Sequence, residues 1–438
     1  MPEAAANAKS PVWTRLKNQT RKPVRFVVST VLMALFGTVV VVRLVVNRVS
    51  EWITGPSGYV IYLVGDFTNS PKHDNIRKGF YEGGTANWEV DHRKVSVVEY
   101  DDQGDLLRAR SLAAEIAARP DTLMVVGHMR STNTKEALPF YARQSSPIPV
   151  VLTTETNPDL SPPRQQGQAA YPIVRLSATD REQAADAVRF ALSKGAKFFW
   201  VVEDTYNPVY SHYLALEFIK RVQQEKGRVV LWSTNLSPPS ADLINKMSVD
   251  CVFFAGVWYN ALVTIRQIEK VGSANPGRFY ILSDASAEKD LVTQGAGDIG
   301  ERVYVLNPMR AQDSDSEGGG YRLYGRDART LVDTLMRTLK QDFPAHRRAN
   351  HTFEYYWKAL LDMHRAADAR DVLYEVISGN LARIGADTGG EGAAARDEGF
   401  TRPNGSYSIN NRAFNVWQAF WSGTQGGFRE PAPAQGRP

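Results

Sequence analysis

The amino-acid sequence predicts an α/β protein made of two doubly wound parallel-sheet lobes joined by a hinge. Short apolar runs rich in β-branched residues alternate with helix-forming segments, which is typical of repeated strand–helix–strand units. These runs are too numerous for one mononucleotide-binding half. A stretch without helical periodicity, "YPIVRLSATD", also separates them into two series. Two lobes joined near residues 175–179 are therefore the economical arrangement.

Most of the predicted strands are short runs dominated by apolar residues. We expect strands at Tyr59–Val64, Val95–Tyr100, Leu123–Val126, Pro149–Leu152, Phe198–Val202, Arg228–Trp232, Cys251–Phe254, Phe279–Leu282 and Val303–Leu306. Helical patterns lie between them, for example "DLLRARSLAAEIAAR" and "DREQAADAVRFALSKG". Thr179 or Asp180 is expected to cap the second of these helices.

The basic charge is concentrated at the N-terminus. The 438-residue chain has a formal net charge of +5, and residues 1–25 contain six Lys and Arg against one Glu. The rest of the chain therefore carries no net charge. A body without excess cations does not favour nucleic-acid binding, so we predict no nucleic-acid partner.

A hydrophobic segment follows this tail. Phe26–Val46 is uncharged up to Arg43 and is about long enough, at about 1.5 Å per residue, to cross a bilayer core. The alternative is a cleavable signal peptide, but its apolar region would be shorter and no small-residue cleavage site follows Val46. By the positive-inside rule the sequence predicts a cytoplasmic tail (1–25), an uncleaved inner-membrane signal anchor (26–47) and a periplasmic or extracellular main domain.

Several classes of chemistry find no support in the sequence. The single cysteine, Cys251, lies in "DCVFFAG" and is expected to be a buried structural thiol. The sequence contains no G-x-S-x-G elbow, no Walker loop and no G-x-G-x-x-G after the first strand. "DSDSEGGG" begins like a calcium loop, but its twelfth position is Tyr324, so a surface loop is expected. We predict no enzymatic activity, catalytic residue, cofactor or metal site.

Polar turns follow four of the predicted strands, in "GHMRSTNT", "LTTETNPDL", "FAGVWYNA" and "ILSDAS". The carboxyl ends of strands in two facing lobes border a common cleft, so these turns are candidate binding positions. A structural role is the alternative, because Ser131 and Asp284 are also residue types that cap helices. We expect His128 to fix its turn by hydrogen bonding. The residues alone leave both roles of Ser131 and Asp284 open.

Together these segments resemble the branched-chain amino acid (leucine-type) binding proteins, which have the type I periplasmic binding protein fold. That family runs strand, Gly-His-x-x-Ser-x-x-Thr, helix, Ile-Pro-strand and Thr-Asn-Pro-x-Leu, which is similar to "VVGHMRSTNTKEALPFYARQSSPIPVVLTTETNPDLSP". The likeness continues to about residue 430. It implies one lobe from 58–176 and 308–405, a second from 177–307 and 406–430, and a disordered tail at 431–438.

The resemblance also implies ligand contacts from the first lobe. The family's carboxylate-binding serine falls on Ser131, its second hydroxyl falls on Thr156, and a backbone contact falls on Thr154. Two hydroxyls and a helix N-terminus suit an α-carboxylate. The chain departs from the family here, because Arg130 and Glu155 place charges where the family is mostly neutral.

In the second lobe the resemblance implies an acid and an aromatic wall. The acidic residue that pairs with the ligand ammonium falls on Asp284, one methylene shorter than the usual glutamate. The aromatic positions fall on Trp258 and on the segment that holds Tyr206 and Tyr210, where Pro208 lies at or near the usual tyrosine position.

The function implied is capture of a small amino-acid-like or amide ligand by closure of the lobes, for an ABC-type permease. The alternative is a sensory or scaffolding ectodomain that signals to, or binds, a membrane partner without transport. An uncleaved anchor favours this alternative, because most transport receptors are released or lipidated.

A topology experiment tests the predicted anchor. A reporter that is active only outside the cytoplasm, fused after Pro438, should be active, because the cations before Phe26 retain the N-terminus inside. The full chain should also stay in membranes after a carbonate wash. Recovery of a shortened soluble form would show that the segment is cleaved.

Overall fold

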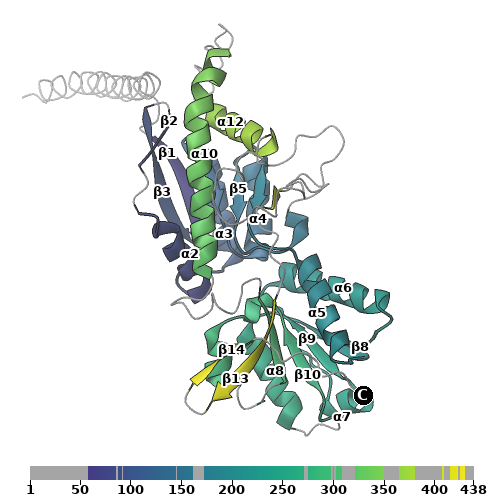
Figure 1. The fold of residues 1–438 in the computed structure, drawn as a ribbon. Coiled ribbons are helices and arrows are strands. Elements are labelled where there is room, and N and C mark those ends of the chain that lie inside the picture. The colour runs from purple at the N-terminus through teal and green to yellow at the C-terminus, as the bar shows by residue number, and fades with distance from the viewer. Residues whose placement is uncertain are drawn as a thin grey trace, which may run out of the picture. The chain divides into compact units, whose positions relative to one another are not determined.

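A computed structural model gives the fold of the chain (Figure 1). It describes residues 58–84, 87–90, 92–144, 146–160, 172–270, 275–296, 299, 302–307, 321–349, 365–379, 407–408, 415–422 and 425–429. The chain divides into two compact units, Met1–Ser57 and Gly58–Pro438, and the described residues belong to the second. The predicted tail, anchor and C-terminal tail lie outside them. Within the described ranges, no helix has the length and apolar character needed to span a bilayer.

The first lobe is built on a sheet with the strand order β12-β6-β5-β4-β1-β3-β2. Its strands are β1 (Gly58–Gly65), β2 (Trp88–Val90), β3 (Arg93–Asp101), β4 (Thr122–Val126), β5 (Val150–Leu152), β6 (Ile173–Arg175) and β12 (Tyr407–Ser408). All neighbours are parallel except β2, which is antiparallel to β3.

Helices cover both faces of this sheet. They are α2 (Pro71–Tyr81), α3 (Leu106–Ala118), α4 (Ser131–Ala142), α10 (Tyr321–Ala349), α12 (Arg365–Gly379) and the 3-10 turn η1 (Pro158–Leu160). Alternate residues of β1 point to opposite faces, as a strand requires. Ile61 and Leu63 pack in the core formed with α2, α10 and α12, whereas Tyr62 and Val64 pack in the core formed with α3 and α4.

The second lobe repeats this plan, with the strand order β14-β13-β11-β10-β9-β7-β8. Its strands are β7 (Phe198–Glu203), β8 (Arg228–Thr234), β9 (Cys251–Ala255), β10 (Phe279–Leu282), β11 (Val303–Asn307), β13 (Asn415–Ser422) and β14 (Gln425–Arg429). The strands are parallel except β13, which is antiparallel to β11 and to β14.

Helices again lie on both faces of this second sheet. They are α5 (Asp180–Ser193), α6 (Pro208–Gln224), α7 (Ala241–Lys246), α8 (Trp258–Lys270), α9 (Lys289–Leu291) and the short turns η2 (Asp284–Ser286) and η3 (Val292–Ala296). Phe199 and Val201 pack with residues of α5 and α6, whereas Trp200 and Val202 pack with residues of α7 and α8. Cys251 is fully buried in the first of these cores, as expected.

The predicted fold class is confirmed for the described part of the chain, and all nine predicted strands are present. The prediction missed β6, which is only three residues long and follows Pro172, so its apolar run was too short to recognise. It also missed β2, β12, β13 and β14, which lie at or next to the edges of the two sheets. Thr179 is the N-cap of α5, and its backbone N–H donates to the carboxylate of Glu182 at 2.6 Å.

The described elements change sheets between β6 and α5, between β11 and α10, and between β12 and β13. The first change follows Arg175, where the hinge was expected. The last change differs from the expected boundary. The family resemblance implies that residues 406–430 belong to the second lobe, whereas Tyr407–Ser408 pairs with β6 in the first sheet. The other predicted lobe limits stay predictions.

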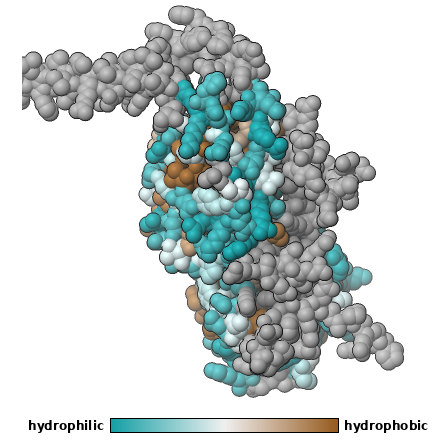
Figure 2. Space-filling model, turned by 60° about the vertical axis from the view of Figure 1, so that its left-hand side comes forward, coloured by the Kyte–Doolittle hydropathy of each residue, from teal (hydrophilic) through white to brown (hydrophobic). Residues whose placement is uncertain are grey.

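One face of the described part is mostly polar. Figure 2 shows one face, on which hydrophilic residues predominate and hydrophobic residues form small patches. The most exposed large apolar side chains, Leu107, Leu236 and Val263, lie on or beside different elements, namely α3, the turn after β8, and α8. Scattered exposure of this kind is ordinary for a globular protein.

Two glycines allow α2 and α10 to cross in backbone contact. A Cβ on Gly79 of α2 would overlap the carbonyl group of Arg322, and a Cβ on Gly325 of α10 would overlap the carbonyl oxygen of Ile76. Both positions are buried. This crossing holds the second half of α2 against α10, and the start of the same helix carries residues of the site described below.

Gly79→Ala should therefore destabilise the protein, although alanine is normally the better helix former by about 1 kcal/mol. Separating the two helices should lower the free energy of unfolding by about 1–3 kcal/mol, the usual cost of overpacking. Gly83→Ala is the control, because a Cβ there would lie 3.5 Å from Arg329 Cγ, an ordinary contact. Denaturant unfolding measures both, and equal stability of the two variants would contradict the proposed crossing.

Candidate functional site

A cavity of about 330 Å³ is lined by residues of both lobes. Its first-lobe residues come from the turns after β1, β4 and β5, and its second-lobe residues come from the turns after β7, β9 and β10. Each of these turns follows the carboxyl end of a parallel strand, where open α/β sheets bind ligands. The four polar turns singled out in the sequence all contribute to this cavity.

Most of the predicted site residues are brought together here. The cavity lining includes Ser131, Thr154, Tyr206, Tyr210, Trp258 and Asp284. Thr156 is not part of the lining and is buried, with 2% exposure. Its hydroxyl lies close enough to the buried carboxyl of Asp180 to influence it, but makes no well-formed hydrogen bond. The turn after β5 directs this side chain toward α5, away from the cavity.

Ser131 is the first residue of α4 and does not cap it, because Arg130 occupies the N-cap position and makes no side-chain capping bond. The Ser131 hydroxyl has no hydrogen-bond partner among the described residues. It is therefore available to a ligand. Its neighbour Thr132 is already used, because the Thr132 hydroxyl donates to Asn207 Oδ1 at 2.5 Å across the lobes.

Asp284 is held in place by two donors of the second lobe. Its Oδ1 accepts the Tyr210 hydroxyl at 2.5 Å and Gln183 Nε2 at 2.7 Å. These bonds run to α6 and α5, so the Asp284 side chain is not the cap of the helix that follows it. Burial and the nearby Asp284 raise the pKa of Tyr210 well above its usual value, which keeps this phenol a donor.

Aromatic side chains form a wall beside Asp284. The rings of Tyr206 and Tyr259 meet edge to face with centroids 5.8 Å apart, and those of Trp258 and Tyr259 do the same at 5.6 Å. Trp258 Nε1 donates to Glu288 Oε2 at 3.1 Å. Burial raises the pKa of Glu288 despite this bond. Tyr259 and Glu288 line the cavity but were not predicted, because their positions depend on how the helices pack.

Arg130 links the lobes at one end of the cavity. Its guanidinium pairs with Asp66 at 2.6 Å, donates to the Tyr206 hydroxyl, and lies 4.4 Å from the centroid of the Tyr206 ring. The unexpected charge of Arg130 is thus balanced within the first lobe. In the described part, Lys72 lines the cavity without an ion-pair partner, and its ammonium lies 4.4 Å from the Tyr321 ring centroid.

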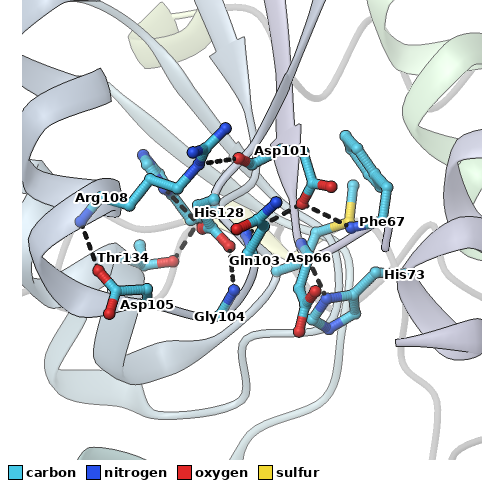
Figure 3. A network of polar contacts seen from close by, with 12 residues as sticks. Asp66, Phe67, His73, Asp101, Gln103, Gly104, Asp105, Arg108, His128 and Thr134 are labelled. Atoms are coloured by element: carbon cyan, nitrogen blue, oxygen red, sulfur yellow. Dashed lines mark hydrogen bonds and ion pairs between the residues drawn. The ribbon is translucent and has the colours of Figure 1, made fainter. Parts of the chain in front are cut away.

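A buried polar network supports the first-lobe turns (Figure 3). His128 is fully buried, with Nδ1 3.1 Å from Asp102 Oδ2 and Nε2 2.9 Å from the Tyr141 hydroxyl. Although burial acts to raise the pKa of Asp102, the bond from His128 holds that pKa below its usual value. His128 therefore fixes its turn by hydrogen bonding, as expected. Asp66 N–H donates to His73 Nδ1 at 3.3 Å in the same network.

The geometry is that of a binding site. Polar and aromatic side chains from both lobes line one cavity. The described residues hold no His, Cys, Asp or Glu cluster suited to a metal ion. The cavity has acids on the second-lobe side, at Asp284, Glu288 and Asp290, and the unpaired cation Lys72 on the first-lobe side. Opposite walls thus offer opposite charges.

The fold is that of the type I periplasmic binding proteins. No family model and no curated protein matches the sequence. Among solved structures, a leucine-binding protein from Thermotoga maritima is similar, with 15% identity, a TM-score of 0.59, and coverage of 85% of this chain and 97% of that chain. The predicted resemblance to leucine-type binding proteins is therefore confirmed at the level of fold.

Two further solved structures share the fold. One is a solute-binding protein of an ABC transporter from Rhodopseudomonas palustris with 3,4-dihydroxybenzoic acid, with 15% identity, a TM-score of 0.57, and coverage of 85% of this chain and 96% of that chain. The other is a branched-chain amino acid transporter substrate-binding protein from Streptococcus pneumoniae with isoleucine, with 14% identity, a TM-score of 0.55, and coverage of 85% and 100%.

The cavity histidine predicts a pH dependence of stability. Burial, with help from Arg130 and Lys72, lowers the pKa of His73 to about 3, below the usual value of 6.5. The folded state therefore excludes a proton that the unfolded state binds. The contribution of neutral His73 to the free energy of unfolding is fully present above about pH 6.5. It is lost as the pH falls toward 3, by at most about 1.4 kcal/mol per pH unit.

Urea unfolding of the parent and of His73→Gln between pH 7.5 and 4.5 measures this contribution. Glutamine retains an acceptor for the Asp66 N–H but does not titrate, so the variant should lose stability less steeply below pH 6.5. His92→Gln is the control, because the His92 side chain is 97% exposed. Parallel curves for parent and His73→Gln would show that His73 does not contribute.

Proposed function

We propose that this chain is an extracytoplasmic solute-binding protein, anchored by its N-terminal segment, that captures a small amino-acid-like solute between its lobes for an ABC-type transporter. The observation that carries the proposal is the arrangement of Asp284, which lines the cavity from the second lobe and is fixed there by Tyr210 and Gln183. A carboxylate held in this way suits a ligand ammonium group.

The opposite wall suits the other end of such a ligand. Ser131 offers a free hydroxyl at the start of α4, where the helix dipole favours an anion, and Lys72 offers a positive charge. The aromatic side chains of Tyr206, Trp258 and Tyr259 add apolar surface to the same cavity. Several solved structures of this fold are transporter proteins in complex with isoleucine or with hydroxybenzoic acids, which supports a small solute as the ligand.

A thermal-shift screen of the full chain in detergent identifies the ligand. The panel consists of amino acids, amides, amines and small carboxylates, including hydroxybenzoates. Because a ligand that binds only the folded state raises the melting temperature, hits should appear among compounds with an ammonium group. A screen without hits would remove the solute-capture function and leave the sensory or scaffolding ectodomain, which needs no solute.

With a confirmed ligand, Asp284→Ala should weaken binding by about 2–3 kcal/mol, or roughly 30- to 150-fold, because a charge-assisted partner is removed from a buried position. Ser131→Ala should weaken it less, because the dipole of α4 and the Lys72 charge remain. Asp242→Ala, on the exposed surface of α7, is the control. Calorimetry that finds parental affinity in both Asp284→Ala and Ser131→Ala would refute this assignment of the cavity.

A further inference from the structure

Glu155 stands in the middle of the predicted carboxylate-binding turns, yet it faces away from the cavity. It is buried, with 1% exposure, in the turn that follows β5. Its carboxylate accepts hydrogen bonds from two different turns. Oε1 accepts the Met129 N–H at 2.8 Å, and Oε2 accepts the Thr153 N–H at 2.8 Å.

Two more donors complete this environment. The Thr134 hydroxyl donates to Oε1 at 3.0 Å, and the Thr154 N–H donates to Oε2 at 3.0 Å. The oxygen of Thr134 in turn accepts the His128 N–H at 3.3 Å, which aims its proton at the carboxylate. Each carboxylate oxygen therefore has two donors, as in sites that bind free anions through backbone N–H groups.

Among the residues that the structure places, no cation contacts the Glu155 carboxylate. Within the described ranges, the Glu155 carboxylate has no Lys, Arg or His ion-pair partner, and Arg175 donates to the Glu155 backbone carbonyl instead. Thr154 is also fully engaged, because its hydroxyl donates to the Met129 carbonyl at 3.1 Å. The backbone N–H groups of Met129, Thr153 and Thr154 and the hydroxyls of Thr134 and Thr154 are thus already taken. The Ser131 hydroxyl has no partner among the described residues.

We propose that these two turns form a carboxylate-binding site that the chain fills with its own side chain, Glu155. This filled site also determines how the cavity binds the anionic end of a solute, an inference that rests on the proposed function. A solute in the cavity meets its anionic end with the Ser131 hydroxyl and the Lys72 ammonium, because the backbone amides of Met129 and Thr154 are occupied. Removal of the Glu155 side chain would open the site to a free monocarboxylate such as formate or acetate.

The test is chemical rescue of Glu155→Ala in the full chain in detergent. The variant should melt below the parent in chloride. In formate or acetate at the same ionic strength, its melting temperature should rise by about 2–4 °C, because the anion binds only the folded state. The parent should not respond. Glu136→Ala, at an exposed position of α4, controls for a general effect of the anions.

Glu155→Gln distinguishes a filled site from an open one. The glutamine side chain occupies the same space, so this variant should be destabilised but should not respond to formate. An equal response in Glu155→Gln or Glu136→Ala would overturn the proposal, and so would the absence of any response in Glu155→Ala. If Glu155→Ala folds only when formate is present, the proposal is supported, and if it folds in neither salt, the proposal is overturned. None of these outcomes depends on whether a solute binds the cavity.

Discussion

Buried turns at the ends of parallel strands must find acceptors for their own backbone N–H groups, and one carboxylate meets this constraint for the turns after β4 and β5. Glu155 accepts the N–H groups of Met129, Thr153 and Thr154. Its four donors join the turn after β4 to the turn after β5, so the position of Ser131 depends on a side chain that the cavity does not contain. Unsatisfied amides here would each cost about 1–3 kcal/mol.

The architecture was predictable because the central strands are buried on both faces. Runs such as Leu123–Val126 and Cys251–Phe254 are apolar over their whole length, and helical periodicity follows them in the sequence. Edge elements lack this signal. β2 is three residues long, β12 is two, and β13 and β14 are antiparallel strands that reach the second sheet only after the chain has built α10 and α12.

The sequence predicted most of the residues that line the cavity, but not the hydrogen-bond partners of the residues around it. The order of polar residues after strands places Ser131, Trp258 and Asp284 at one cavity, because strand ends converge whatever the loops do. The sequence does not show that Thr156 turns toward α5, or that Glu155 bonds with residues of the preceding turn. These facts depend on rotamers and on contacts between segments far apart in the chain, for which local patterns carry no signal.

The first lobe is built from two separate parts of the chain, which affects the order in which the lobes can fold during synthesis. The core beside β1 contains residues of α10 and α12 as well as residues of the N-terminal strands. Roughly two hundred residues separate β6 from the end of α12, which is about 10–40 s of translation at about 5–20 residues per second. The part of the second lobe from α5 to β11 emerges within that interval, and its last strands, β13 and β14, follow α12. The first-lobe sheet therefore leaves the ribosome before α10 and α12, and the apolar face that these helices cover stays open to chaperones, or to the wrong partner, while most of the second lobe folds.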